Sequence, residues 1–467
     1  MRRRIYHKKK TDYSLILWLL LIASVISGAV YLYRQQGFNP QKLVDNSVLQ
    51  GRRFGGEVKE VAALDGKLKA YLLEDKTNPI ISVDFIFKGA GAAADPSGKE
   101  GLAKFTAAML KDGAGNYTAQ QFKEELEDYA IGLSFSAGSD DFGGRLVTTK
   151  ENAAKAYELL KLVLQKPRFD DKDMQRTKSE FRLARQKQTE HPASELSLVF
   201  NEELYGIHPY GRNPLGNAAA VDGFKADDLR QMMANRLAQS NLIIGVAGDI
   251  NAEELKQVLL QVFGELPEKA RVNFVRDAEV NFDNRSRNID RKTGQTISLS
   301  ASRGTSRSSA DFYPLYVANY IYGGAGLNSR LAQAVREKEG LVYSISSGLG
   351  MQDKSNLVVG SFSTTPENFA AVNKLVAAER QKFAAEGASQ AELQQAKDYL
   401  IASYNLRFAA IDDISQMLVM MQKDNLGADF LRKRNDYIES VSLEEVNKAA
   451  ATYFADETVT VNIGNFK

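Results

Sequence analysis

One segment of this 467-residue chain occurs twice, and the repeat limits the folds open to it. Residues 145–152 read RLVTTKEN and residues 360–368 read GSFSTTPEN, so Thr148 aligns with Thr364 at an offset of 216 residues. In both copies a predicted strand gives way to a predicted helix at the same point, and a pair of long helices follows. A repeat of this size predicts two copies of one domain rather than one large α/β sheet. The expected fold class is α+β, with a helix-packed antiparallel sheet in each copy.

The two copies are expected at residues 59–265 and 292–467, with a polar interdomain linker at residues 266–291. In the first copy, the apolar pattern of residues 67–74 and 80–87 predicts a pair of neighbouring strands. The other elements predicted there are strands at 133–137, 144–149 and 241–247, helices at 99–111, 151–165, 171–188 and 193–204, and a helix that begins at Thr118 with a capping box to Gln121.

The first 36 residues differ from the rest in charge and hydropathy. Six Arg and Lys residues precede the first acid, Asp12, and residues 15–33 then carry no charge. Such a run nearly crosses a hydrocarbon core of about 30 Å, which predicts a transmembrane anchor. Residues 1–14 would be a cytoplasmic basic tail, and residues 34–58 a linker on the far side. A cleaved signal peptide is the alternative, although apolar residues continue past the small residues 27–29.

Composition excludes several classes of function. The chain has 60 Lys and Arg against 58 Asp and Glu, but without the first 36 residues the counts are 53 and 57. No basic excess is left, and no nucleic-acid partner is expected. The absence of Cys excludes disulfides, thiolate nucleophiles and Cys-ligated zinc. Three His residues leave little material for a histidine-based metal site.

Residues 88–110, KGAGAAADPSGKEGLAKFTAAML, hold the most informative motif. The segment resembles the zinc-site region of the pitrilysin, insulinase and mitochondrial processing peptidase (inverzincin) family. Active members of that family carry His-x-x-Glu-His after Gly-Leu-Ala. In this chain Lys104 and Ala108 occupy the histidine positions and Ala107 occupies the glutamate position. A protonated ammonium group and two methyl groups have no lone pair to offer a metal, so the motif is degenerate.

The resemblance also places a further zinc ligand, a glutamate, near Ala184 or Arg185 on a following long helix. Neither residue is an acid. The resemblance therefore implies no metal, no cofactor and no catalytic residue on this chain, with the zinc expected on a partner. His191 and His208 are each predicted in loops without a spaced partner ligand.

Residues 322–344, YGGAGLNSRLAQAVREKEGLVYS, resemble the signature of the family's second domain. In the family, an Arg and a Tyr spaced as Arg336 and Tyr343 contact the bound peptide across the cavity from zinc. The resemblance implies a substrate-binding role for both, in trans, because a guanidinium and a phenol are suitable donors to peptide carbonyls. The alternative is that Arg336 pairs with a neighbouring acid and that Tyr343 is a half-buried strand residue. Arg330 is expected to pack helices together or to contact a subunit, and the glycines at 323, 324 and 326 are expected to allow a turn between helices.

The family also contains two-chain peptidases in which one chain carries zinc and a silent homologue supplies the Arg and the Tyr. The resemblance therefore implies a short two-domain bacterial type with a half-clamshell shape, acting as a catalytically silent subunit. A single helix would anchor it in the inner membrane, with its bulk in the periplasm. The expected partners are a zinc-bearing homologous subunit, in a heterodimer, and unfolded peptides. Two alternatives stay open: a non-enzymatic peptide-binding or assembly module, and an active metalloendopeptidase with atypical ligands.

Overall fold

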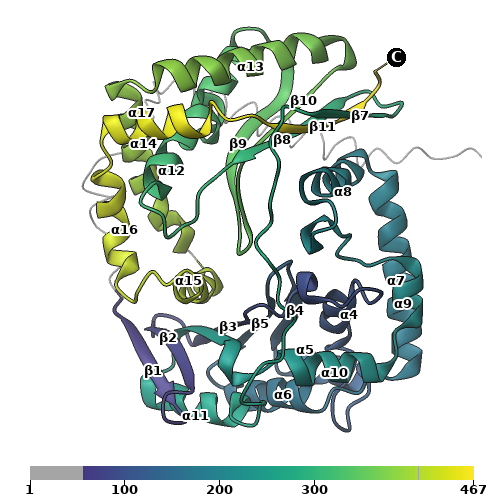
Figure 1. Ribbon diagram of the computed structural model, residues 1–467. Helices are drawn as coiled ribbons and strands as arrows, with labels where there is room; N and C mark the ends of the chain where they lie inside the picture. Colours follow the sequence, from purple (N-terminus) through teal and green to yellow (C-terminus); the bar gives the residue numbers. More distant parts are fainter. Residues whose placement is uncertain (1–55, 409, 467) are drawn as a thin grey trace, which may run out of the picture. The chain divides into compact units, whose positions relative to one another are not determined.

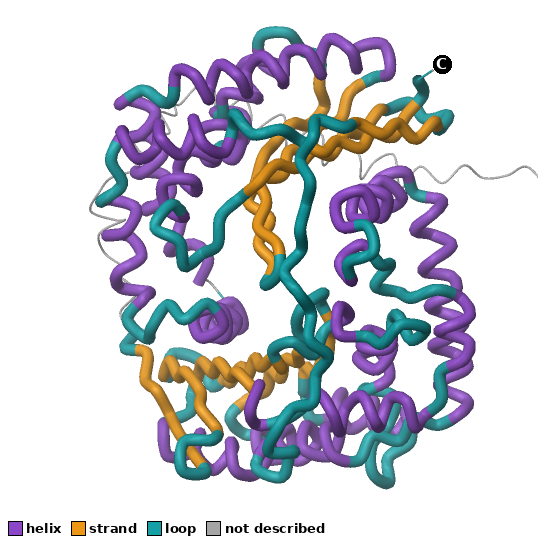
Figure 2. The backbone as a smooth tube through the Cα atoms, in the orientation of Figure 1, coloured by secondary structure: helices purple, strands orange, loops and turns teal. Residues whose placement is uncertain are grey.

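Two β-sheets with helices packed against them make up the described part of the protein (Figures 1 and 2). The computed structural model describes residues 56–408 and 410–466. The six strands of the first sheet lie in the spatial order β1 (Val58–Ala63), β2 (Leu68–Glu74), β6 (Leu242–Gly248), β3 (Ile80–Phe87), β5 (Phe142–Thr149) and β4 (Gly132–Ala137). The five strands of the second lie in the order β7 (Ser286–Asp290), β11 (Val459–Gly464), β8 (Thr296–Arg303), β10 (Ser355–Thr364) and β9 (Val342–Gln352).

The strand order confirms the internal repeat. The succession β6-β3-β5-β4 in the first sheet corresponds to β11-β8-β10-β9 in the second, and β2 and β7 hold equivalent places beside them. Strand β5 ends at Thr149 and β10 ends at Thr364, each shortly before a long helix. Thr148 and Thr364 are both buried, with at most 2% of their surface exposed. The α+β class with two homologous domains is therefore confirmed.

The antiparallel prediction is wrong for one strand pair in each sheet. Strands β2 and β6 are parallel, and so are β7 and β11. The predicted pairing of β2 with β3 is also wrong, because β6 lies between them. Strands β2 and β3 run in opposite directions, so a strand inserted between them is necessarily parallel to one and antiparallel to the other. Strand β6 arrives from far along the chain, and local sequence patterns do not report such an insertion.

Helices pack around both sheets, and the first five helices of the first copy correspond to those predicted at 99–111, from Thr118, and at 151–165, 171–188 and 193–204. The helices of the first copy are α4 (Leu102–Met109), α5 (Ala119–Asp128), α6 (Ala153–Gln165), α7 (Asp171–Glu190), α8 (Pro192–Tyr205), α9 (Ala218–Gly223), α10 (Ala226–Arg236) and α11 (Ala252–Phe263). Those of the second copy are α12 (Phe312–Asn319), α13 (Phe369–Glu386), α14 (Gln390–Ala402), α15 (Ile411–Lys423), α16 (Phe430–Glu439) and α17 (Leu443–Tyr453). The capping box of Thr118 and Gln121 is present at the start of α5. In the first core, the rings of Phe85 and Phe263 pack edge-to-face at 5.3 Å and join β3 to α11.

Each copy contributes one helix to the other copy's sheet. Helix α15 lies on the face of the first sheet, over β6 and β3. A Cβ atom on Gly245 would lie only 2.2 Å from the carbonyl oxygen of Ser415, so only glycine permits this close approach. In return, α8 packs against the second sheet, where Leu196 and Phe200 share an apolar cluster with Val461. The two copies are therefore joined through their cores.

The predicted interdomain linker contains regular structure. Strand β7 lies inside the predicted linker 266–291. It is an edge strand whose residues are mostly exposed, so its sequence lacks the apolar run that would have predicted a strand. The predicted tail, the anchor at 15–33 and nearly all of the linker at 34–58 fall outside the described residues. Within the described part of the chain, no helix combines the length and apolar character needed to cross a membrane.

Candidate functional site

A buried ion pair fixes the helix that carries the degenerate zinc motif. Helix α4 starts after Gly101, which has a φ of 92° that favours glycine. The Asp95 carboxylate accepts hydrogen bonds from the backbone nitrogens of Gly101 at 3.0 Å and Ala103 at 3.2 Å. It also accepts one from the Arg236 guanidinium on α10 at 2.8 Å, and both side chains are at most 6% exposed. Asp95 thus satisfies donors that the first turn of α4 leaves free.

The three motif residues on α4 differ in their surroundings. Lys104 is half-buried and Ala108 is exposed, so they share the outer face of the helix. Ala107 is buried, with 3% of its surface exposed. No member of this face can donate an electron pair to a metal at neutral pH.

Helix α7 runs antiparallel beside α4. The rings of Phe105 and Phe181 are 5.1 Å apart, and Asp112, just beyond α4, pairs with Arg176 at 2.7 Å. Moving toward the end of α4 therefore means moving toward the start of α7. This register places the middle of α7, which holds Ala184 and Arg185, beside the Lys104 end of α4.

The residues at this place do not fit a zinc ion. Among the described residues, no group of three or more His, Asp or Glu side chains is placed to hold a metal. His191 lies at the junction of α7 and α8. His208 caps the short helix η2 (Pro209–Gly211) by accepting from the Tyr210 backbone at 3.2 Å, and its other ring nitrogen lies 3.0 Å from the Arg276 carbonyl oxygen. Both histidines are in loops, as predicted.

Backbone irregularities concentrate in the second signature, residues 322–344. It starts within a π-helix, η4 (Tyr320–Gly324), and includes a second, η6 (Ala332–Glu337). The pairing of β9 with β10 then shifts by one residue, which leaves Tyr343 as the extra residue of a β-bulge. Single π-helical turns and β-bulges disturb the regular backbone hydrogen bonding. They are frequent at functional sites, where they change the direction of a side chain.

Arg336 and Tyr343 both point to solvent. Arg336 lies on η6 and is exposed, and Tyr343 has 55% of its surface exposed. Among the described residues, neither side chain has a hydrogen-bond, ion-pair or ring partner. The expected alternative, in which Arg336 pairs with a neighbouring acid, is therefore not the arrangement found, and Tyr343 is more than half exposed.

Arg330 has a structural role within the second copy. Its guanidinium donates to both oxygens of Glu392 at 2.6 and 2.8 Å and lies over the Phe383 ring. The Arg330 guanidinium lowers the pKa of Glu392 to about 2. The glycines act differently from one another: Gly326 has a φ of 58° at the turn, whereas a Cβ on Gly323 would lie 2.6 Å from Ser347 on β9.

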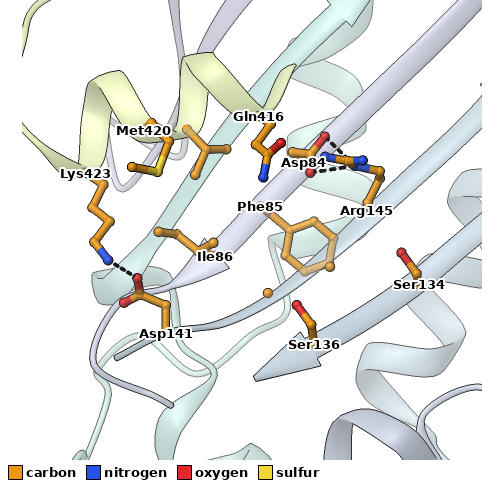
Figure 3. A pocket seen from close by; sticks show the side chains of 13 residues that line it. Asp84, Phe85, Ile86, Ser134, Ser136, Asp141, Arg145, Gln416, Met420 and Lys423 are labelled. Atoms are coloured by element: carbon orange, nitrogen blue, oxygen red, sulfur yellow. Dashed lines mark hydrogen bonds and ion pairs between the residues drawn. The ribbon is translucent and has the colours of Figure 1, made fainter. Parts of the chain in front are cut away.

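Strand β4 forms one edge of the first sheet and borders a cavity of about 330 Å³ (Figure 3). Ser134 and Ser136 of β4 line it, together with β3, β5 and α15. Two ion pairs also line it, Arg145 with Asp84 at 2.9 Å and Lys423 with Asp141. The full set of lining residues is Asp84, Phe85, Ile86, Ser134, Ser136, Asp141, Gly143, Gly144, Arg145, Gln416, Val419, Met420 and Lys423.

Burial perturbs the charges around this cavity. It raises the pKa of Asp84 and of Asp141 above the usual range. Burial also lowers the pKa of Lys423, but the carboxylates of Asp141 and Asp353 raise it by more. The sequence did not predict this site, because its walls come from segments some 270 residues apart. The only local signal was the Ser-x-Ser alternation of β4.

Two family models match the chain. One, the insulinase family (peptidase family M16), matches residues 59–217, and the other, the peptidase M16 inactive domain, matches residues 223–400. The chain belongs to the M16, or insulinase, family, which confirms the resemblance seen in its motifs. The second model begins before β6, which belongs to the first sheet.

Individual relatives agree with this family. The non-peptidase homologue YmxG of Helicobacter pylori is 26% identical over 381 residues, which cover 80% of this chain and 86% of that protein. An uncharacterised zinc protease of Mycobacterium bovis is 28% identical over 265 residues, 56% of this chain and 60% of that protein. A crystal structure described as a peptidase M16 inactive domain from Pseudomonas fluorescens aligns with a TM-score of 0.81 and 25% identity, covering 87% of this chain and 98% of that one.

Proposed function

We propose that this chain is a catalytically silent M16 subunit that binds unfolded peptides and completes the active site of a zinc-bearing homologue. The chemistry of α4 supports silence, because Lys104, Ala107 and Ala108 offer no zinc ligand and no general base. The name of the Helicobacter pylori relative, a non-peptidase homologue, agrees with a silent member of the family.

The donors Arg336 and Tyr343, which are exposed and have no partner among the residues that the structure describes, carry the proposal. A chain that needed these side chains only for folding would be expected to pair them, as it pairs Arg330 with Glu392. Their positions on a π-helix and a β-bulge instead support a ligand-directed role. In a mixed dimer they would donate to a peptide carbonyl, or to the oxyanion that develops on it, beside the partner's zinc.

Co-purification and kinetics test this role. The full-length chain is mixed with a homologue that carries His-x-x-Glu-His, and the assembly and its peptidase activity are measured. Arg336→Ala with Tyr343→Phe should lower kcat/KM by about tenfold or more while the mixed dimer still forms. Matched controls are Arg303→Ala and Tyr399→Phe, since these side chains are also exposed but lie outside the signature. Unchanged turnover in the first variant, or no mixed dimer at micromolar concentration, contradicts the proposal.

The second candidate function is peptide binding without a partner, and strand β4 favours it. Within residues 56–408 and 410–466, β4 pairs with β5 on one side only, so its outer backbone groups are free for an added strand. Tight binding of extended peptides by the chain alone, with no stimulation of any zinc-bearing homologue, would select this second function.

The remaining expectations belong to the same proposal. The anchor at residues 15–33 would hold the subunit in a bacterial inner membrane with its bulk in the periplasm. Zinc would be supplied by the partner. An active peptidase with atypical ligands is the contrary case, and one equivalent of tightly bound zinc on the pure chain would establish it.

A further inference from the structure

The cavity beside β4 lies where an added peptide strand would place alternate side chains. Ser134 and Ser136 are exposed on one face of β4, whereas Leu133 and Ala137 are buried on the other. A strand added to the free edge keeps this alternation, so every second peptide side chain lies on the serine face. Figure 3 shows both serines at the cavity.

The sheet register places small side chains side by side where Ser136 borders the cavity. Ser136 is opposite Gly143, and Gly143 is opposite Ile86 on β3. The next row on the same face of the sheet, two residues along β4, is occupied by large side chains. In that row Ser134 is opposite Arg145, and Arg145 is opposite Asp84. A peptide residue opposite Ser136 would therefore direct its side chain across a serine and a glycine into the cavity.

Charge decides which side chain suits the cavity. Two cations and two carboxylates line the cavity, so their net charge is zero, but each cation also pairs with a second carboxylate outside the lining. Arg145 contacts Asp412 at 3.1 Å as well as Asp84, and Lys423 contacts Asp353 at 3.1 Å as well as Asp141. The cluster of six groups therefore has an excess of two negative charges, in a partly buried setting where charge is weakly screened.

The walls suit a long side chain with a charged tip. Ile86, Val419 and Met420 supply apolar surface between the two ion pairs, and Met420 is 40% exposed. The aliphatic stem of Lys or Arg packs on such surface while its head reaches the carboxylates. An acidic side chain would meet the negative excess, and a short one would leave the hollow unfilled.

We propose that this cavity is a selectivity pocket for a lysine or arginine side chain of an extended peptide that pairs with β4. The inference rests on the proposed peptide-binding function and adds the chemical class of the preferred peptide. It requires no zinc on this chain and no catalysis.

Peptide titrations test the pocket on the full-length protein. The probes are three unfolded nine-residue peptides of Thr, Val and Ala that differ only at the central residue, which is lysine, norleucine or glutamate. Fluorescence anisotropy should give the lysine peptide a Kd about tenfold lower than norleucine, with glutamate weakest, and added salt should narrow the difference. The variant Ser136→Lys places a cation in the hollow and should abolish the preference. Its matched control is Ala62→Lys, the same charge change at an exposed position of β1, the opposite edge of the same sheet, and it should keep the preference.

The outcomes separate this inference from the function on which it rests. Equal Kd values for all three peptides would overturn the pocket and leave peptide binding intact. No binding of any peptide would overturn both. Loss of the preference in Ala62→Lys as strongly as in Ser136→Lys would show a general charge effect and would also overturn the pocket. Circular dichroism of both variants checks that the fold is retained.

Discussion

The buried pair of Asp95 and Arg236 predicts a large loss of stability from a single substitution. Asp95→Ala would leave the Arg236 guanidinium, whose side chain is 6% exposed, without its carboxylate partner. Breaking a buried ion pair in this way costs about 3–5 kcal/mol. The change also removes the acceptor for two backbone donors at the start of α4, and lost caps cost about 1 kcal/mol. Because the two effects share one carboxylate, we expect a total of about 4 kcal/mol rather than their sum.

Urea denaturation followed by far-ultraviolet circular dichroism measures this loss at neutral pH. The matched control is Asp227→Ala, which breaks an Asp–Arg pair with Arg230 whose side chains are 83% and 50% exposed. It should cost less than about 0.5 kcal/mol. The double variant Asp95→Ala with Arg236→Met should be more stable than Asp95→Ala alone, because it leaves no unpaired buried charge. A cost for Asp95→Ala as small as that of the control, or a double variant less stable than the single one, would refute the reasoning.

Three further predictions follow from other parts of the chain. Because Arg330 holds the pKa of Glu392 near 2, below the usual value of about 4.3, this pair should stabilise the fold above pH 4.3 and lose its effect as the pH falls toward 2. The stability difference between wild type and Arg330→Ala should shrink by about 1–2 kcal/mol between pH 7 and pH 2, after allowance for solvent screening. The contact of Arg330 with the Phe383 ring does not depend on pH, so a constant remainder is expected. A difference that does not change with pH would contradict the assignment. Gly323→Ala should cost about 1–3 kcal/mol, since its Cβ would lie 2.7 Å from a backbone nitrogen of β9, whereas Gly324→Ala, with its nearest atom at 3.3 Å, should cost less; equal denaturation midpoints would contradict this. Removal of residues 1–36 should release the chain from alkaline-washed membranes into the soluble fraction, and continued membrane association would rule out the predicted anchor.

Local patterns in the sequence predicted much of the fold. The helices and strands that were predicted in the first copy lie within a few residues of their predicted bounds, because each has its own apolar period, whereas β1, α9, α10 and α11 were not predicted. The alignment of Thr148 with Thr364 was sufficient to identify two copies. Three features depend on contacts between distant segments and left no local signal: the insertion of β6 between β2 and β3, the exchange of α8 and α15, and the Asp95–Arg236 pair.

The sequence predicted the chemistry of the candidate sites, whereas the burial and backbone geometry of their residues come from the structure. Chemistry alone made Lys104, Ala107 and Ala108 unfit for zinc, and their positions on α4 add only that Ala107 is buried. The signature motif identified Arg336 and Tyr343, and the structure adds that both are exposed and lack partners among the described residues. The β-bulge at Tyr343 and the two π-helices follow from pairing and packing, which a single sequence does not encode in a readable way.

Metal content and proteolysis of the purified full-length chain, measured alone and with a zinc-bearing homologue, test the account most directly. Alone, the chain should hold far less than one zinc per molecule and should leave an unfolded peptide intact. With the homologue present, cleavage should exceed that of the homologue by itself and should fall in the Arg336→Ala and Tyr343→Phe variant. One equivalent of zinc on the isolated chain, together with cleavage in the absence of any partner, would contradict the account.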